Sequence, residues 1–190
     1  RPAGADADPA GPGDVAAGGA AAALGGGWAF GADAVPPEVK SSLGAPLGLQ
    51  LYSLRDYAPK DLPGTLARLR SLGIVEVESA GLYDRDVAAV RAAFDKAGLR
   101  CNGAHIGYDR WQKDAAGAVK EAKALGARFA TGAGTKGDKD VTREDVLRPA
   151  ETFTAAGKAC AAEGVRFCYH CHGYEFVPSP EGTLFDTLVR

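Results

Sequence analysis

The sequence contains no methionine, and only three of its 190 residues are histidine. Because it begins with Arg1, we expect the true start of the gene product to lie outside it. It has no run of Lys or Arg and a formal net charge of −2, which argues against a nucleic-acid partner. The four cysteines are too few and too scattered for a disulfide framework. The apolar part of the N-terminal region is too short and too rich in glycine for a stable membrane span.

Residues 1–46 differ in composition from the rest of the chain. They are rich in Pro, Gly, Ala and Asp without a periodic apolar face, so we predict a disordered or low-complexity segment and linker. Residues 15–30, followed by Ala32-Asp33-Ala34, are typical of the apolar region and A-x-A cleavage site of an export signal. We therefore predict an exported or periplasmic protein. A plain linker on a cytoplasmic protein is the alternative.

From residue 47 onward the pattern of strand, polar loop, amphipathic helix and glycine repeats. Strands are predicted at 47–54, 74–80, 99–105, 127–133 and from 165, and helices at 61–72, 84–97, 115–125, 142–163 and from 182. Asp61 is the expected cap of the first helix, and Thr142 with Asp145 resembles a capping box. Pro149 lies inside the fourth helix, which predicts a kink or a late start.

Strands that alternate with helices pair in parallel, which leaves a doubly wound sheet or a (β/α)8 barrel. Polar residues follow several successive strands, and this favours the barrel, since an open sheet concentrates its chemistry at one switch point. A barrel needs about 250 residues. We therefore predict an α/β fold over residues 47–190: a TIM barrel truncated after about five units.

The stretch 165–176, VRFCYHCHGYEF, carries the densest group of polar residues. In a strand, His170 and His172 would point to the same side, and Glu175 would lie on the loop just past the strand end. Two imidazoles and a carboxylate at a strand end suit a metal site or acid/base chemistry. A pair of histidines held by hydrogen bonds in a polar core is the alternative.

Other strand ends supply further candidates. Glu78 is flanked by apolar residues, where a carboxylate is rarely buried without a partner or a role. His105 joins it as a second candidate, or only hydrogen-bonds within the barrel mouth. Tyr52 and Arg55 either bind substrate hydroxyls or close the barrel floor.

Two further motifs are weak. Cys168 and Cys171 form C-x-x-C, but such redox or zinc pairs normally sit in a turn or at a helix start. Residues 132–137 match G-x-G-x-x-G, yet no helix follows directly, so a loop at the barrel mouth is favoured over a dinucleotide site.

Four segments together carry a resemblance to a known family. GLQLYSLRD (48–56), E-x-A-G (78–81), GAHIG (103–107) and YHCHGYEF (169–176) resemble the sugar phosphate isomerase/epimerase family of the xylose isomerase-like barrels. The resemblance implies a divalent metal (Mn, Co, Mg or Zn) with His170 as a substituted ligand and Glu175 as ligand or proton acceptor. It also implies further ligands on strands six to eight, so we expect an incomplete and inactive site in this fragment.

The resulting prediction is a metal-dependent isomerase or epimerase that moves a proton next to the carbonyl of a sugar or keto-sugar. We assign catalysis to Glu175, His172, His105 and Glu78, the metal to His170 and Glu175, and substrate binding to Tyr52 and Arg55. Replacing His170 or Glu175 by Ala should reduce turnover without unfolding the barrel. The alternatives are a non-catalytic carbohydrate-binding or partner barrel, and a lyase or hydrolase of keto-glycosides. A DNA-repair endonuclease of the same superfamily would need a basic surface. The expected partner is a small-molecule sugar substrate, and a homo-oligomer is an alternative to a monomer.

Overall fold

The computed structural model describes residues 36–133, 141–180 and 182–189. Within them, five parallel strands form one sheet: β1 (Gly48–Gln50), β2 (Glu76–Ala80), β3 (Arg100–Gly107), β4 (Phe129–Ala133) and β5 (Arg166–His170). Each strand pairs with the next one in sequence, so the order β1-β2-β3-β4-β5 never reverses. A doubly wound sheet requires such a reversal. The strand order therefore selects the barrel over the open sheet.

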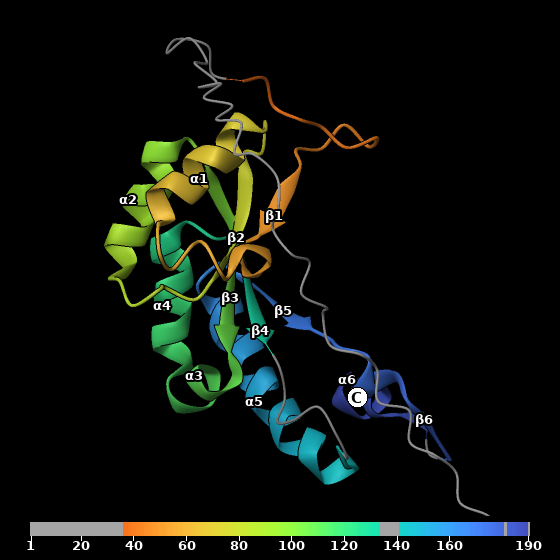
Figure 1. Cartoon of the computed structure of the whole chain (residues 1–190). Helices are drawn as coiled ribbons and strands as arrows, with labels where there is room; N and C mark the ends of the chain where they lie inside the picture. Colours follow the sequence, from red (N-terminus) through yellow and green to blue (C-terminus); the bar gives the residue numbers. More distant parts are fainter. Residues whose placement is uncertain (1–35, 134–140, 181, 190) are drawn as a thin grey trace, which may run out of the picture. The chain divides into compact units, whose positions relative to one another are not determined.

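Helices connect the strands and lie on one face of the sheet. α1 (Leu62–Ser71), α2 (Val87–Ala97), α4 (Ala115–Leu125) and α5 (Arg143–Ala162) follow β1 to β4 in turn. Figure 1 shows α1, α2 and α4 side by side along the sheet. The shorter elements are the 3-10 helices η1 (Leu51–Leu54) and η2 (Tyr174–Phe176), the helices α3 (Tyr108–Lys113) and α6 (Leu184–Val189), and the hairpin strands β6 (Pro178–Ser179) and β7 (Gly182–Thr183).

The helix starts follow the predicted caps. The Asp61 carboxylate accepts a hydrogen bond of 2.9 Å from the Gly64 N–H at the start of α1. Thr142 and Asp145 form a complete capping box at the start of α5. Because this box satisfies the first N–H groups, α5 begins at Arg143 and continues through Pro149, without the late start that the proline suggested.

The apolar core lies between the helices and the sheet. Leu62 and Leu66 are fully buried, and each contributes about 1.5–3 kcal/mol by leaving water. Leu72, the last residue of the helix predicted over 61–72, is 55% exposed, because it lies just beyond the last helical residue of α1. Side chains that meet this core from the sheet include Val77, Ala104, Ile106 and Ala130. The opposite face of the strands is therefore left for polar groups.

Two elements differ from the sequence-based prediction. The strand expected at 47–54 ends at Gln50, and the chain then turns through η1 with Leu51 buried. Helix α3 was not predicted, because one short turn carries little periodicity. It is anchored by Trp111, which is buried and whose Nε1–H donates a 3.1 Å hydrogen bond to the Ile106 carbonyl.

Residues 36–46 lie against the turn between α1 and β2. The Val39 N–H donates to the Gly73 carbonyl at 2.9 Å. Gly73 has φ +79°, and a Cβ there would stand 2.5 Å from Val39 Cγ2 and 2.8 Å from the Pro37 carbonyl oxygen. Glycine is thus required at this turn both for its backbone conformation and for the close approach of the preceding segment.

Several sequence-based predictions lie outside the described residues. These include disorder and an export signal in residues 1–35, and Gly134 and Gly137 of the G-x-G-x-x-G motif. They stay predictions. Within residues 36–133, 141–180 and 182–189, no helix has the length and apolar character needed to cross a bilayer.

Candidate functional site

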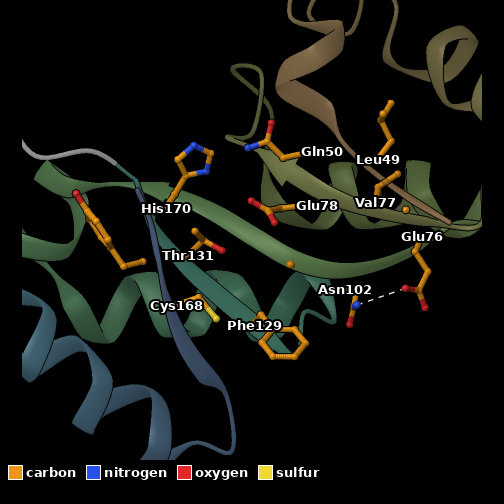
Figure 2. Close-up of a pocket in the computed structure, with 13 residues that line it drawn as sticks. Leu49, Gln50, Glu76, Val77, Glu78, Asn102, Phe129, Thr131, Cys168 and His170 are labelled. Carbon is orange, nitrogen blue, oxygen red and sulfur yellow. Dashed lines mark hydrogen bonds between the residues drawn. The ribbon is translucent and has the colours of Figure 1, made fainter. Parts of the chain in front are cut away.

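A cavity of about 470 Å³ opens on the face of the sheet that turns away from the apolar core. Side chains at alternate strand positions reach it, because successive residues of a strand point to opposite faces. Figure 2 shows Gln50, Glu78, Thr131, Cys168 and His170 projecting into this space from β1, β2, β4 and β5. Residues that are distant in sequence thus meet in one place.

Glu78 is a carboxylate of this cavity. It is paired in register with Gln50 of β1, whose side-chain amide favours the charged form of the carboxylate. Burial raises the pKa of Glu78 above its usual value, while the Gln50 amide and the charge of His170 offset part of that rise. A carboxyl with a raised pKa is a candidate for proton transfer, because its pKa moves towards neutral pH.

A glycine makes the room for Glu78. Gly103 of β3 pairs with Glu78, where the register between β2 and β3 shifts. A Cβ at Gly103 would stand 3.1 Å from both Cγ and Oε2 of Glu78, which is closer than ordinary van der Waals contact. The small residue therefore lets the carboxylate lie over the neighbouring strand.

The chain's three histidines lie together beside the cavity. The His170 ring is 5.0 Å from the His105 ring, edge to face, and 5.0 Å from the His172 ring, measured between centroids. β5 ends at His170, so His172 is not placed by strand alternation as predicted. Its position comes from the loop that follows.

His105 stays neutral at neutral pH. Burial, together with the neighbouring imidazoles of His170 and His172, lowers the pKa of His105 to about 4. Its Nε2 atom is buried and has no hydrogen-bond partner within the part of the chain that the structure describes. A buried imidazole nitrogen without a partner is costly, so a ligand hydroxyl or carbonyl at this point would stabilise it.

Glu175 lies in a different environment from the one the sequence suggested. We expected it on an open loop, but it is 0% exposed within η2. Its Oε1 accepts the Tyr169 hydroxyl at 2.6 Å, and its Oε2 accepts the backbone N–H of His172 at 2.8 Å. Burial by itself raises the pKa of Glu175, but these hydrogen bonds outweigh it, and the pKa lies below its usual value.

Tyr52 and Arg55 lie apart from the cavity lining. Both are exposed, and Tyr52 belongs to η1. The Arg55 guanidinium lies 5.0 Å from the centre of the Tyr52 ring, and its Nη1 donates to the Tyr52 carbonyl at 3.2 Å. The two side chains thus lie against each other, and a role in binding substrate stays a prediction.

The sequence analysis did not assign Gln50, Asn102, Thr131 or Cys168 to the cavity. Two of them carried a usable signal. Cys168 precedes His170 by two residues on one strand, and Gln50 lies in the same predicted strand as Tyr52. Period-two alternation from the chosen residues would have found Cys168, but only the strand register brings Thr131 beside His105.

The residues fit a metal poorly. Among the described residues, no group of three or more His, Cys, Asp or Glu side chains is arranged to hold an ion. Both oxygens of Glu175, one of the two predicted ligands, are already bonded to Tyr169 and His172. His170 is the remaining predicted ligand, and one imidazole does not make a metal site.

No protein-family model and no curated protein matches the chain. Solved structures do. A sugar phosphate isomerase/epimerase from Parabacteroides distasonis ATCC 8503 is 22% identical with a TM-score of 0.61, over 75% of this chain and 60% of that chain. An AP endonuclease of family 2 from Brucella melitensis is 14% identical with a TM-score of 0.56, over 75% of this chain and 64% of that one.

Two further structures carry ligands. A D-allulose 3-epimerase from Methylomonas sp., in complex with D-allulose, is 16% identical with a TM-score of 0.55, over 83% of this chain and 61% of that chain. The IOLI protein with a binding zinc atom is 13% identical with a TM-score of 0.50, over 72% of this chain and 53% of that chain. At these identities the likeness shows the fold alone, a partial TIM barrel. The chain spans 60% of the first of these proteins.

Proposed function

We propose that the protein is an isomerase or epimerase that moves a proton next to the carbonyl of a sugar or keto-sugar. The observation that carries the proposal is Glu78: a carboxylate with a raised pKa, held by Gln50, beside His170 in a cavity at the strand ends. Active sites of such barrels are built at the carboxyl ends of the strands. The fold likeness to isomerases and epimerases supports the same reaction class.

The proposed chemistry uses an acid/base group and hydrogen-bond donors. Glu78 takes the proton from the carbon next to the carbonyl, which leaves an enediolate, and returns it to the adjacent carbon on the same face. An epimerisation requires in addition a second acid group that protonates the opposite face, while Glu78 keeps the proton it took. The imidazoles of His105 and His170 face the substrate oxygens and stabilise the charge that develops on them. His172, which lies against His170, orients that ring. A positioned acid/base group of this kind contributes about 10²–10⁴-fold to rate.

The lining suits a neutral polyol. Gln50 and Asn102 contribute amides and Thr131 a hydroxyl, which are the groups that bind sugar hydroxyls. Among the described lining residues there is no Lys or Arg to bind a phosphate. The complex of a similarly folded epimerase with D-allulose supports a keto-sugar of that size.

The metal stays the least supported part of the proposal. It rests on His170 among the predicted ligands and on the fold likeness to a zinc-binding protein. We derive no step through a metal. The absence of a metal-holding group among the described residues also favours a second candidate function, a carbohydrate-binding barrel without chemistry.

Proton exchange tests the proposal directly. The protein is incubated with D-allulose or D-fructose in D₂O, and loss of the proton next to the carbonyl is followed by NMR, with and without added Mn, Co, Mg or Zn. Glu78→Gln should reduce exchange at least about a hundredfold, the scale of a lost acid/base group. Metal content is measured on the same samples.

Glu151→Gln is the matched control. It makes the same chemical change at an exposed position of α5, outside the cavity lining. We expect at most about a threefold change there, the scale of ordinary surface substitutions. Sugar binding without exchange in the unmodified protein would favour the carbohydrate-binding barrel.

A further inference from the structure

The loop from Tyr169 to Glu175, which we term the Glu175 loop, is closed by one carboxylate. Tyr169 is the penultimate residue of β5, and Glu175 lies in η2. The tyrosine hydroxyl and the His172 N–H converge on the two oxygens of Glu175 at 2.6 and 2.8 Å. The ring of His172 adds a third interaction, with its Nδ1 3.7 Å from Oε1.

The sheet does not hold His172. Among the residues that the structure describes, the pairing of β4 with β5 ends at Ala133 and His170, two residues before His172. A backbone N–H near a buried site needs an acceptor. Glu175 supplies this acceptor, and its hydrogen bond with the His172 N–H holds the chain just after His170.

We propose that Glu175 is a positioning residue, which acts by holding His172, and through it His170, in the geometry that the reaction needs. Glu175 is 0% exposed and does not line the cavity, so substrate does not touch it. His172 is 45% exposed, stacks on Tyr174 at 5.6 Å and 9°, and lies against His170. The carboxylate thus contacts His172 from a buried position outside the cavity. The proposal rests on the proposed function for its activity readouts alone.

The geometry also explains why the residue is a glutamate. Two donors arrive from two directions, and a carboxylate offers an acceptor to each. A glutamine offers one neutral acceptor oxygen, so it loses the charge that strengthens both bonds, and its NH₂ group faces either the Tyr169 hydroxyl, which can accept it, or the His172 N–H, which cannot. Glu175→Gln therefore disturbs the loop with almost no change in volume, and this makes it the informative variant.

The test compares Glu175→Gln, Tyr169→Phe and a control in the same protein. The readouts are hydrogen exchange of the His172 amide, the imidazole NMR signals of His172, and kcat and KM for the keto-sugar. Glu175→Gln should speed exchange of the His172 amide about tenfold, the equivalent of one lost hydrogen bond. It should lower kcat about ten- to a hundredfold, the cost of misplacing a group, with KM within about threefold.

Tyr169→Phe removes the bond to Oε1 and leaves the His172 N–H bond in place. It should lower kcat by about threefold to tenfold, and the double variant should lose less than the product of the single effects, because both changes act on one carboxylate. Glu151→Gln, an exposed glutamate on α5, makes the same chemical change elsewhere and should alter none of the readouts.

Each result decides the proposal. Faster His172 exchange together with lower kcat supports it. Lower kcat with unchanged His172 signals would mean that Glu175 takes part in the chemistry itself and would overturn it. A lower melting temperature with unchanged kcat per folded molecule would leave a purely structural role and would overturn it as well. If the unmodified protein exchanges no sugar proton, the proposed function fails, and the His172 amide alone decides whether Glu175 holds that residue.

Discussion

Glu78 and Glu175 are both carboxylates beside imidazoles, yet their surroundings shift their pKa values in opposite directions. Glu78 faces a cavity, and its pKa is raised because burial is only partly offset by Gln50 and His170. Glu175 is sealed from solvent, and its pKa is lowered because hydrogen bonds from Tyr169 and the backbone outweigh burial. The comparison shows that hydrogen-bond donors aimed at a carboxylate, rather than burial alone, decide whether its pKa is raised or lowered.

The largest expected effect is on stability. Glu175→Ala removes a fully buried side chain and the acceptor of two partly buried hydrogen bonds, from the Tyr169 hydroxyl and the His172 N–H, and we expect a loss of about 3 kcal/mol in the free energy of unfolding. Glu78→Ala opens onto the cavity and should cost less than about 1 kcal/mol. Urea unfolding measures both. Equal losses for the two variants would remove the distinction.

A second change acts on Glu78 from outside. Gly103→Ala places a Cβ 3.1 Å from Glu78 Oε2, so the carboxylate has to move. We expect turnover to fall about tenfold or more and stability by about 1 kcal/mol, from misplacement and overpacking respectively. Gly107→Ala on the same strand is the control, since nothing lies within 4 Å of its Cβ position. Unchanged turnover in Gly103→Ala would show that the position of Glu78 is not critical.

A smaller effect appears in the pH dependence of stability. The pKa of His105 is about 4 in the folded chain and about 6.5 when unfolded. Between these values the unfolded chain binds a proton that the folded chain does not, so this contribution is complete above about pH 6.5 and declines as the pH falls towards 4. His105→Asn should therefore reduce the change in the free energy of unfolding between pH 7 and pH 5, which is measured by urea unfolding at each pH.

His170 and His172 are the titratable neighbours of His105, and Glu78 contributes a slope of opposite sign because its pKa is raised. Measuring the slope in a Glu78→Gln background isolates His105. A slope that survives His105→Asn in that background would assign the effect to another group.

The smallest effect is expected at the exposed pair of Tyr52 and Arg55. Arg55→Ala removes a stacked guanidinium from an exposed ring and should change the free energy of unfolding by less than about 1 kcal/mol. If the pair binds substrate hydroxyls, KM for the sugar rises a few-fold and kcat stays constant. An unchanged KM would favour the alternative, in which Tyr52 and Arg55 close the barrel floor and do not bind substrate.

Much of the fold was readable from local patterns. The caps at Asp61 and Thr142 and the alternation of strand and helix predicted the order of elements, because capping and periodicity involve residues close in sequence. Helix α3 was not predicted, since its anchor Trp111 packs against Phe167 of β5, a residue far away in the sequence. The end of β5 was also misjudged, because an apolar run does not show where strand pairing stops.

The sequence by itself determined which residue types stand at the strand ends: Glu78, His105, His170 and the segment up to Glu175. Only the tertiary structure decided their relations. The ring contact of His105 with His170 and the register of Gln50 with Glu78 join positions far apart in the chain. A pKa and an exposed fraction depend on every atom within a few ångströms, whichever part of the chain supplies it. The sequence could therefore point to both glutamates, but it could not tell that Glu78 lines a cavity and that Glu175 is fully buried.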